Sequence, residues 1–405
     1  MAEAAGPVIV VGAGPVGLFA ALALRARRIP VLLLEADPAD RVSTGSRALY
    51  VHGESLRLLE STSPRLGAEL AAHGVLWNVR RTLYRGRQVY AREYPAHDAS
   101  RGLPPFTSLR QSETERILRD ACQRAGVDML WNHPVTEVAA DSDGVIVTTA
   151  GGETCWGSHV VGADGARSTV RKSAGVSLAG SAAQDGFHVV VDVADEPCRA
   201  PSLERVMHYE HPAADGRGVL IVPYASGFQV DVQSRAGDDP DVIASPAEVR
   251  RWLPELIGPT PTARITAISV YRFLQLIADD FTDPHRRVLL VGEAAHLFPP
   301  FGARGMNSGF VDAQAAAEAI ATGRRSPAAN ADAVTGFVTA RRAAAQVNSA
   351  AAGAALRHLR PRGAAARLRR TAAARLAPVV PRFGEWLEHA PYGPRPRTST
   401  SRTGR

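Results

Sequence analysis

A glycine-rich turn near the start of the chain has the residue types that bind a dinucleotide. It reads Gly12-Ala13-Gly14-Pro15-Val16-Gly17 and follows the apolar run Val8–Val11, while a second apolar run, Val31–Leu34, ends in Glu35. In a strand–turn–helix unit the first glycine makes a tight turn, the second admits a pyrophosphate, and the third lets the helix pack closely. A carboxylate about 20 residues further on accepts hydrogen bonds from the ribose and repels a 2′-phosphate. The pattern therefore predicts a site for NAD or FAD rather than NADP.

A second stretch, residues 288–313, has the features of a site for a flat ligand with a sugar-like chain. Glu293 follows the apolar run Val288–Val291, where a carboxylate can accept hydrogen bonds from a polyol. Two prolines stiffen the loop that comes next, and two glycines let the backbone approach a ligand with no Cβ in the way. The unpaired N–H groups at the start of the following helix bind anions and polar oxygens. The candidate ligand-binding residues are Glu293, Pro300, Gly302, Gly305, Met306 and Asn307, and the alternative is a turn without a ligand.

Three further polar residues have both a ligand-binding and a structural interpretation. Asp164 follows another apolar run, and it either contacts a ligand or caps the helix after it. Arg47 either pairs with a pyrophosphate or caps a loop. Gln111 precedes Ser112 and Glu115, which we expect to form a capping box for a helix reaching about residue 125. The amide of Gln111 is then placed to point out of the helix toward a ligand.

Composition argues against several classes of partner. Twelve arginines among residues 353–405, set against two glutamates, more than account for the net charge of +7, so the rest of the chain is mildly acidic. A body without a basic face does not favour nucleic acid, and no stretch is long and apolar enough to span a membrane. Cys122, Cys155 and Cys198 match no metal-ligand spacing and are typical of free thiols in a reducing cytoplasm. We therefore expect a cytoplasmic protein without a metal, a nucleic-acid partner or a membrane segment.

Taken together and in this order, the three strand–turn–helix motifs resemble those of the FAD-dependent aromatic hydroxylases. This is the para-hydroxybenzoate hydroxylase-like class of single-component (class A) flavoprotein monooxygenases, and the resemblance covers about residues 7–360. The middle motif is Asp164-Gly165 with Arg171 downstream, and the third is Gly292-Glu293-Ala294-Ala295-His296, then Pro299-Pro300, Gly302 and Gly305-Met306-Asn307. The family has Asp where this chain has Glu293, which keeps the acceptor but changes its reach.

The resemblance implies an α/β protein: a Rossmann-type FAD-binding fold (GR2-like) with an inserted mixed or antiparallel substrate sheet and C-terminal helices. We expect the FAD-binding domain in residues 1–74, 101–180 and 285–325. The substrate-binding sheet is expected in residues 75–100 and 181–284. C-terminal helices are expected over residues 326–390, followed by a disordered basic tail over residues 391–405.

The chemistry that the resemblance implies needs no nucleophilic side chain. NADPH or NADH reduces FAD, O2 gives a flavin C4a-hydroperoxide, and one oxygen atom is transferred to an electron-rich aromatic ring. Residues 302–307 are implied to lie along the isoalloxazine ring, and Pro300 is implied to line the face where oxygen and substrate meet. The chain has no second GxGxxG motif, so NAD(P)H is expected to bind transiently, and the protein is expected to be a monomer or a homodimer.

Candidates for a base that ionises a phenol lie in the inserted sheet. They are His208, Tyr209, His211 and Tyr224, and of these Tyr209 and His211 join Pro300 as predicted catalytic residues. Candidates for the wall of a flat substrate are Tyr224, Tyr271, Phe273 and Phe301. The strand over residues 219–224 carries no Arg or Lys to clamp a carboxylate, which favours a neutral phenol or a polycyclic metabolite.

Two other functions remain open on the sequence. The first keeps FAD but changes the reaction to epoxidation, Baeyer–Villiger insertion or hydride transfer, because the motifs describe flavin binding and not the destination of the oxygen. The second is a binding protein that has the scaffold without a working flavin. The unbroken glycine set and the intact Glu35, Asp164 and Glu293 argue against the second.

Overall fold

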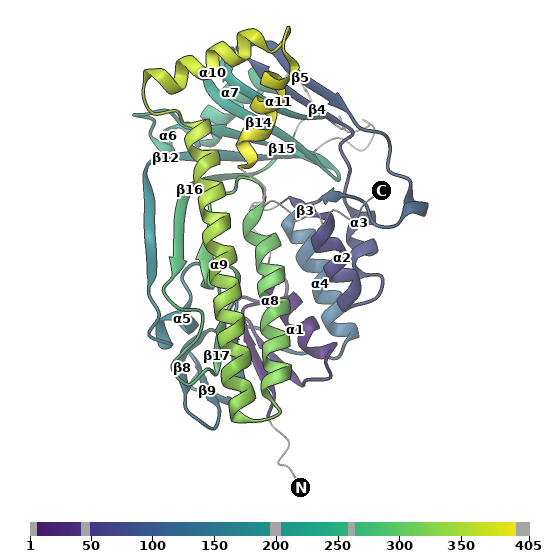
Figure 1. The fold of residues 1–405 in the computed structure, drawn as a ribbon, viewed down its shortest axis with the longest axis vertical. Helices are drawn as coiled ribbons and strands as arrows, with labels where there is room; N and C mark the ends of the chain where they lie inside the picture. Colours follow the sequence, from purple (N-terminus) through teal and green to yellow (C-terminus); the bar gives the residue numbers. More distant parts are fainter. Residues whose placement is uncertain (1–5, 42–48, 195–203, 258–263, 394–405) are drawn as a thin grey trace, which may run out of the picture.

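The computed structural model describes residues 6–41, 49–194, 204–257 and 264–393. The part shown at the bottom of Figure 1 is built on a parallel sheet with strand order β17-β11-β1-β2-β7. Its strands are β1 (Val8–Val11), β2 (Val31–Leu34), β7 (Asp128–Leu130), β11 (His159–Gly162) and β17 (Val288–Leu290). Three of them are buried along their whole length, as expected of parallel strands that are covered on both faces.

Helices and short strands surround the parallel sheet. The apolar faces of α1 (Pro15–Arg25), α4 (Gln111–Arg124) and α8 (Arg304–Gly323) join its strands in the largest hydrophobic core. Beside them lie α2 (Gly53–Thr62), α3 (Leu66–His73) and η1 (Ala99–Arg101), with the strand pair β3 (Tyr50–His52) and β6 (Phe106–Ser108). A small antiparallel sheet is formed by β8 (Val135–Ala140), β9 (Val145–Thr149) and β10 (Thr154–Gly157), with α5 (Thr169–Ser173) next to β8.

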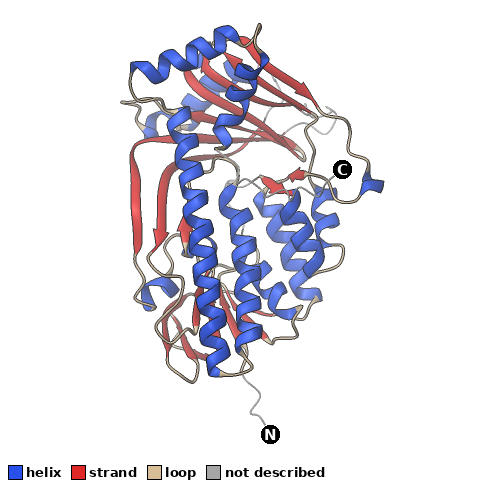
Figure 2. Ribbon diagram, viewed as in Figure 1, coloured by secondary structure: helices blue, strands red, loops and turns tan. Residues whose placement is uncertain are grey.

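A mixed sheet occupies the other half of the molecule (Figure 2), with strand order β18-β16-β12-β15-β14-β13-β4-β5. Neighbouring strands are antiparallel except for β13 and β4. Its strands are β4 (Val79–Tyr84), β5 (Arg87–Glu93), β12 (Leu178–Ala194), β13 (Glu204–His211), β14 (Arg217–Tyr224), β15 (Gly227–Gln233), β16 (Arg264–Ala278) and β18 (His296–Leu297). The long strands β12 and β16 run from this sheet down toward the parallel sheet (Figure 1).

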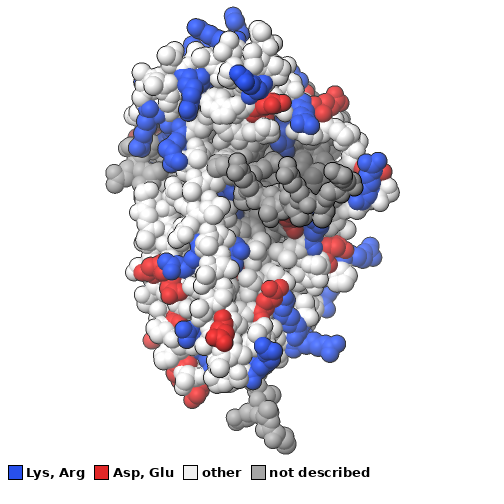
Figure 3. Space-filling view, in the orientation of Figure 1, with Lys and Arg blue, Asp and Glu red and all other residues white. Residues whose placement is uncertain are grey.

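The two faces of the mixed sheet are covered by different helices. Valines at alternate positions of β12 and β15 pack against α7 (Pro246–Ile257) near α6 (Pro240–Ile243) and η2 (Pro212–Ala214). Alternation places the polar residues of the same strands on the opposite face. That face is covered by α9 (Pro327–Leu359), α10 (Ala364–Leu376), α11 (Pro381–His389) and η4 (Ala390–Tyr392). In the view of Figure 3, arginines lie over the C-terminal helices while both charge signs are spread below.

The ordered chain extends beyond residue 390, where we expected the tail to begin. Pro391 is buried, and the carbonyl oxygen of Tyr392 accepts a hydrogen bond from Arg304 Nη2 at 2.9 Å. Nearby, the fully buried Glu388 accepts hydrogen bonds from Arg205 Nη1 (2.8 Å) and Thr82 Oγ1 (2.5 Å). These contacts fasten the segment onto β4 and β13, and residues 394–405 lie outside the described part.

The expected capping box is wrong. The helix begins at Gln111, with Arg110 as its N-cap and no side-chain cap hydrogen bond. The carboxylate of Glu115 instead accepts a hydrogen bond from Gln111 Nε2 at 2.9 Å. Among the helices of the described residues, none is long and apolar enough to cross a membrane.

Candidate functional site

The predicted motifs meet at one edge of the parallel sheet. The strands before them are parallel, so their carboxyl ends lie together, which is where ligands bind in open α/β sheets. A Cβ placed on Gly12 would lie 2.5 Å from the carbonyl oxygen of Ala163, and one on Gly292 would lie 3.2 Å from the side chain of Val16. The turns after β1, β11 and β17 are therefore in contact with one another.

The three glycines of the first turn have separate roles in the structure. Gly12 has φ +103°, which favours glycine, and a Cβ on Gly17 would lie 1.9 Å from the carbonyl oxygen of Gly12. Those two glycines are required by the turn and by the packing of α1. Gly14 is the N-cap of α1, ahead of Pro15, and a Cβ there would meet nothing within 4 Å. Gly14 therefore borders open space at a helix N-terminus, which fits a pyrophosphate.

Glu35 lies against this turn from the end of β2. Its Oε2 accepts a hydrogen bond from the N–H of Ala13 at 2.5 Å, and its Oε1 accepts one from the N–H of Asp37 at 3.0 Å. The Nη1 of Arg41 lies 3.4 Å from Oε1. The carboxylate is buried and ionically paired, and it holds the glycine-rich turn against β2.

The first turn of α4 lies beside the same glycine-rich turn. Arg41 Nη2 is 3.3 Å from the carbonyl oxygen of Ala13 and 3.5 Å from Glu115 Oε2. Gln111 lies in this first helical turn, and its amide donates to Glu115. A pocket between these elements is lined by Ala13, Arg41, Ser112, Glu115, Arg119 and Trp131.

Asp164 has the structural role that the sequence left open. Its Oδ1 accepts a hydrogen bond from the hydroxyl of Ser168 (2.5 Å), and its Oδ2 accepts one from the N–H of Val170 (3.0 Å). Ser168 is in turn the N-cap of α5. Arg171 Nη1 donates to the carbonyl oxygen of Ala294 at 3.0 Å. The middle motif thus organises its own turn and ties it to the turn after β17.

The turn after β17 is held by a buried network that the sequence analysis missed. Asp312, on α8, is fully buried and accepts hydrogen bonds from the N–H of Gly292 (3.2 Å) and from Arg341 Nε (2.6 Å), and His296 Nε2 lies 2.6 Å from it. Burial alone raises the pKa of Asp312, but His296 and Arg341 outweigh burial and the pKa is lowered. The signal was an acidic residue among the apolar positions of a predicted helix.

Glu293, in η3 (Gly292–Ala294), is positioned by this network. Its side chain is half-buried, and its carboxylate makes no hydrogen bond with any residue of the described part. The carboxylate is therefore available to a ligand at the sheet edge, and its contact with a polyol stays a prediction.

The start of α8 is anchored by the side chain of Asn307. Its Nδ2 donates to the carbonyl oxygens of Tyr50 (2.9 Å) and Ala303 (2.7 Å), and its Oδ1 accepts from the N–H of His52 (2.9 Å) and the hydroxyl of Ser55 (2.7 Å). All hydrogen-bonding positions of this amide are thus engaged by the protein. A hydrogen bond from Asn307 to a ligand must therefore come from its backbone.

Backbone N–H groups are available at the first turn of α8, because the first N–H groups of a helix have no intrahelical partner. They include those of Gly305 and Met306, the second and third residues after the N-cap Ala303. A Cβ on Gly305 would meet nothing within 4 Å. Gly302, with φ +77°, is a required turn glycine, since a Cβ there would lie 2.9 Å from the carbonyl oxygen of Tyr392. Gly305 therefore borders open space, as Gly14 does at α1.

The loop before α8 faces a group of aromatic side chains. Pro300 is half-buried, and Phe301 lies 5.3 Å from Phe273 between ring centroids. Phe273 lies 5.8 Å from Tyr271 on the same strand. The structure brings together three of the four aromatic residues predicted to wall a flat substrate.

Tyr209 and Tyr224 are engaged elsewhere. The hydroxyl of Tyr209 donates to the carbonyl oxygen of Leu387 at 2.7 Å and lies 2.9 Å from His358 Nε2, and burial raises its pKa well above the ordinary value. The hydroxyl of Tyr224 donates to the carbonyl oxygen of Val193 at 3.1 Å. Both tyrosines are buried in contacts that position strands and helices.

The two predicted histidines lie at a turn. His211 Nδ1 accepts a hydrogen bond from the N–H of Ala213 at 3.2 Å, and its ring lies 4.1 Å from that of His208. Burial and His211 lower the pKa of His208 to about 4. Among the described residues, the hydrogen bonds and ring contacts of these two histidines do not involve the loop before α8. Arg47 lies outside the described residues.

A family described as "FAD binding domain" matches residues 6–350 of the chain. The chain belongs to this FAD-binding family. The geometry fits the cofactor, since the glycines that border open space, Gly14 and Gly305, lie at the two helix starts that the motifs assign to the pyrophosphate and the flavin ring.

Curated members of the FAD-binding family include named monooxygenases. The chain is 33% identical over 329 residues to 6-methylpretetramide 4-monooxygenase of Streptomyces rimosus, covering 77% of this chain and 55% of that protein. It is 30% identical over 336 residues to para-nitrophenol 4-monooxygenase of Pseudomonas sp. (strain WBC-3), covering 77% of each. The chain spans 53% to 62% of the length of the first curated relatives that it matches.

Solved structures of the same fold agree with this membership. The crystal structure of p-nitrophenol 4-monooxygenase PnpA from Pseudomonas putida DLL-E4 superposes with a TM-score of 0.75 at 25% identity. The superposition covers 97% of this chain and 99% of PnpA. The predicted fold class, an FAD-binding Rossmann-type domain with a substrate sheet, is confirmed.

Proposed function

We propose that the chain is an FAD-dependent, NAD(P)H-consuming monooxygenase that hydroxylates a neutral phenolic or polycyclic aromatic substrate. The observation that carries the proposal is the position of the loop at Pro300. It leads into the open helix start at Gly305, and its Phe301 side chain packs against Phe273, next to Tyr271. A flat cofactor and a flat substrate can therefore meet across this loop.

Residues of the chain supply binding and orientation, while bound FAD supplies the redox chemistry with O2 and NAD(P)H. Gly14, at the start of α1, leaves room for the pyrophosphate. Glu293 offers a free carboxylate to the ribityl hydroxyls. The N–H groups of Gly305 and Met306 would donate hydrogen bonds to polar oxygens of the ring, and the N-terminus of α8 would stabilise negative charge there.

The substrate class follows from the charges around the aromatic group. Arg110, whose guanidinium lies 5.5 Å from the centre of the Tyr224 ring, is 3.8 Å from the buried Asp192. Arg360, near Phe273, donates to the backbone carbonyl oxygens of Phe187 and Ser234. Both cations are used by the protein, which favours a neutral phenol over an aromatic carboxylate.

The remaining partners follow from the family and the thiols. We propose that NADPH or NADH binds transiently and that the protein acts as a monomer or a homodimer. Cys122 and Cys155 are free, which is consistent with a cytoplasmic location.

The test is NADPH and NADH consumption in air by the FAD-loaded protein, with and without a panel of phenols and hydroxyquinones. Strong stimulation by one class, with a product heavier by one oxygen atom, is expected. Bound FAD without stimulation by any phenol would favour epoxidation, Baeyer–Villiger insertion or hydride transfer. A colourless protein that takes up no FAD would refute the cofactor assignment.

A matched pair of variants ties the activity to the proposed flavin site. Gly305 and Gly336 are both helical glycines at which a Cβ would meet nothing within 4 Å. Gly305→Ala should lower FAD affinity and coupled turnover, because the Cβ enters the space assigned to the ring. Gly336→Ala, on an exposed turn of α9, should leave both unchanged.

A further inference from the structure

A histidine outside the predicted set lies on the polar face of the mixed sheet. His188, on β12, is 5% exposed. The pairing of β12 with β15 places Val190 opposite Asp231 and His188 opposite Gln233. Because partners across a sheet share a face, the imidazole of His188 and the carboxylate of Asp231 lie on the same side. His188 Nδ1 is hydrogen-bonded to Asp231 Oδ1.

The other ring nitrogen of His188 is buried without a partner. No residue of the described part makes a hydrogen bond to Nε2. The carboxylate is an acceptor, so a neutral His188 carries its proton on Nδ1 and presents a bare lone pair at Nε2. Leaving such a buried atom unsatisfied destabilises the fold. His188 Nε2 is therefore free to accept a hydrogen bond from a ligand.

The surroundings of His188 connect it to the proposed substrate site. Its ring lies 4.6 Å from that of Phe273 and 5.9 Å from that of Phe301, which directly follows Pro300. Tyr271 is its register partner on β16. A donor that reaches Nε2 among these rings belongs to a flat, apolar molecule that carries a hydroxyl group.

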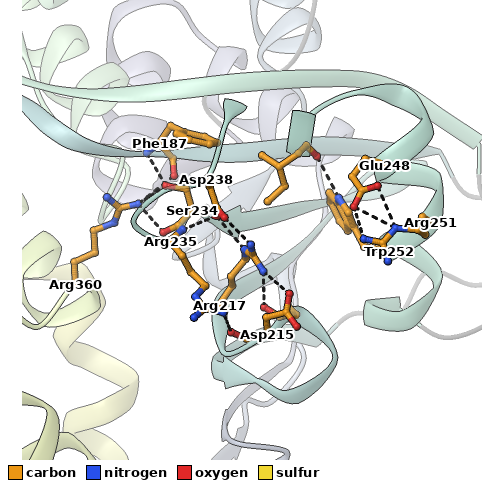
Figure 4. Close-up of polar contacts among 12 residues, drawn as sticks. Phe187, Asp215, Arg217, Ser234, Arg235, Asp238, Glu248, Arg251, Trp252 and Arg360 are labelled. Carbon is orange, nitrogen blue, oxygen red and sulfur yellow. Dashed lines mark hydrogen bonds and ion pairs between the residues drawn. The ribbon is translucent and has the colours of Figure 1, made fainter. Parts of the chain in front are cut away.

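The backbone next to this pair is held in place by Arg360, the C-cap residue of α9 (Figure 4). Arg360 donates to the carbonyl oxygens of Phe187 (3.2 Å) and Ser234 (3.0 Å) and to the hydroxyl of Ser234 (2.7 Å). The hydroxyl of Ser234 accepts a hydrogen bond from the N–H of Phe187 at 2.9 Å. The residue before His188 is therefore pinned, which fixes the position of the imidazole.

We propose that His188, oriented by Asp231, is the base that accepts the proton of the phenolic substrate. The inference rests on the proposed hydroxylase function and names the residue that would act as its base. The O–H bond of the phenol breaks, its electron pair stays on the ring oxygen, and a new N–H bond forms at Nε2. Asp231 stays ionised and stabilises the imidazolium, which returns the proton to the product. The resulting phenolate is the electron-rich ring that oxygen transfer requires.

The first test compares His188→Gln, Asp231→Asn and the wild type, all loaded with FAD, with His285→Gln as the control. His285 is an exposed histidine at a turn before β17. Loss of a positioned base typically costs 10²–10⁴-fold, so His188→Gln should lose about that much kcat at pH 7. The deficit should shrink as the pH rises past the phenol's own pKa. Asp231→Asn should lower kcat and shift the pH profile with little change in KM, and His285→Gln should match the wild type.

The pH profile must be read against the charged groups that face His188. These are Asp231 on β15, Tyr271 on β16 and Arg360 at the C-cap of α9. A second readout uses 4-nitrophenol, whose ionised form is yellow, bound to each variant. The wild type should ionise the bound probe at a lower pH than His188→Gln does.

Two results would overturn the inference, and they are distinguishable. If phenols stimulate NAD(P)H consumption equally in the wild type and in a folded, FAD-loaded His188→Gln variant at every pH, His188 is not the base and the hydroxylase proposal stands. If no phenol binds to or stimulates the wild type, the proposed function fails and this inference fails with it.

Discussion

The glycine-rich turn allows ligand binding and folding to be separated by two single substitutions. A Cβ on Gly14 would meet nothing within 4 Å, whereas one on Gly17 would lie 1.9 Å from the carbonyl oxygen of Gly12. Gly14→Ala therefore adds a methyl group to the ligand side of the turn. Gly17→Ala forces α1 away from β1.

Gly14→Ala is expected to change mainly the affinity for FAD, and Gly17→Ala mainly the free energy of unfolding. Gly14 has φ −70° and ψ 175°, which alanine adopts without strain, so Gly14→Ala should change the free energy of unfolding by less than about 1 kcal/mol. If the methyl group displaces one hydrogen bond to the pyrophosphate, the loss of about 1.5–3 kcal/mol corresponds to roughly 10- to 150-fold in Kd. Gly17→Ala overpacks a backbone contact and should cost about 2–3 kcal/mol of stability or more.

The assay is titration of the apoprotein with FAD, followed by quenching of flavin fluorescence, together with urea unfolding of the apoprotein. The expected result is a stable Gly14→Ala variant with weak FAD binding and a destabilised Gly17→Ala variant. The reasoning is refuted if Gly14→Ala binds FAD as the wild type does, or if Gly17→Ala unfolds at the same urea concentration as the wild type.

Two further predictions concern buried polar groups. Asp312→Asn leaves the Arg341 cation uncompensated next to His296, so it should cost about 3–5 kcal/mol of stability. The control Asp332→Asn, an exposed change on α9, should cost nothing measurable. Equal unfolding midpoints for the two variants would contradict this prediction. Burial lowers the pKa of His159 to about 4, against about 6.5 when unfolded. Its contribution to stability is therefore complete above about pH 6.5 and is lost as the pH falls toward 4. His159→Gln should remove about 3 kcal/mol of the fall in unfolding free energy across this range, and an unchanged slope would show that His159 titrates normally.

The nucleotide-binding half could be predicted because its signals are local. The signals lie within short stretches: the apolar runs, the spacing of the glycines and the carboxylate of Glu35. The glycines mark the turns because those turns need a backbone conformation or a close approach that only glycine allows. The capping box at Ser112 and Glu115 failed for a different reason. The carboxylate that the local motif would have used is bound instead by Gln111, one turn earlier in the same helix, and by Arg41, from a distant part of the chain.

The substrate half was harder to predict because its contacts depend on strand register. His188 and Asp231 are 43 residues apart in the sequence. Alternation along β12 and β15 puts His188 and Asp231 each on the polar face of its own strand. Only the register between the two strands brings them side by side. The predicted base candidates Tyr209 and His211 have suitable side chains. Tyr209 is enclosed by α9 and α11, which no local pattern specifies, and His211 lies at the turn leading into η2.

The contacts of Glu388 and Tyr392 have a consequence for how the protein is made. Glu388 binds Thr82 across 306 residues of sequence, and Arg304, in the first turn of α8, binds the carbonyl oxygen of Tyr392. During synthesis the glycine-rich turn emerges first, while the loop at Pro300 lacks one of its supports until the chain has grown past residue 392. Contacts of such long range form slowly, and partly assembled sheets expose edges that aggregate. The late-made C-terminal helices should therefore control how much of the newly synthesised chain reaches the folded state.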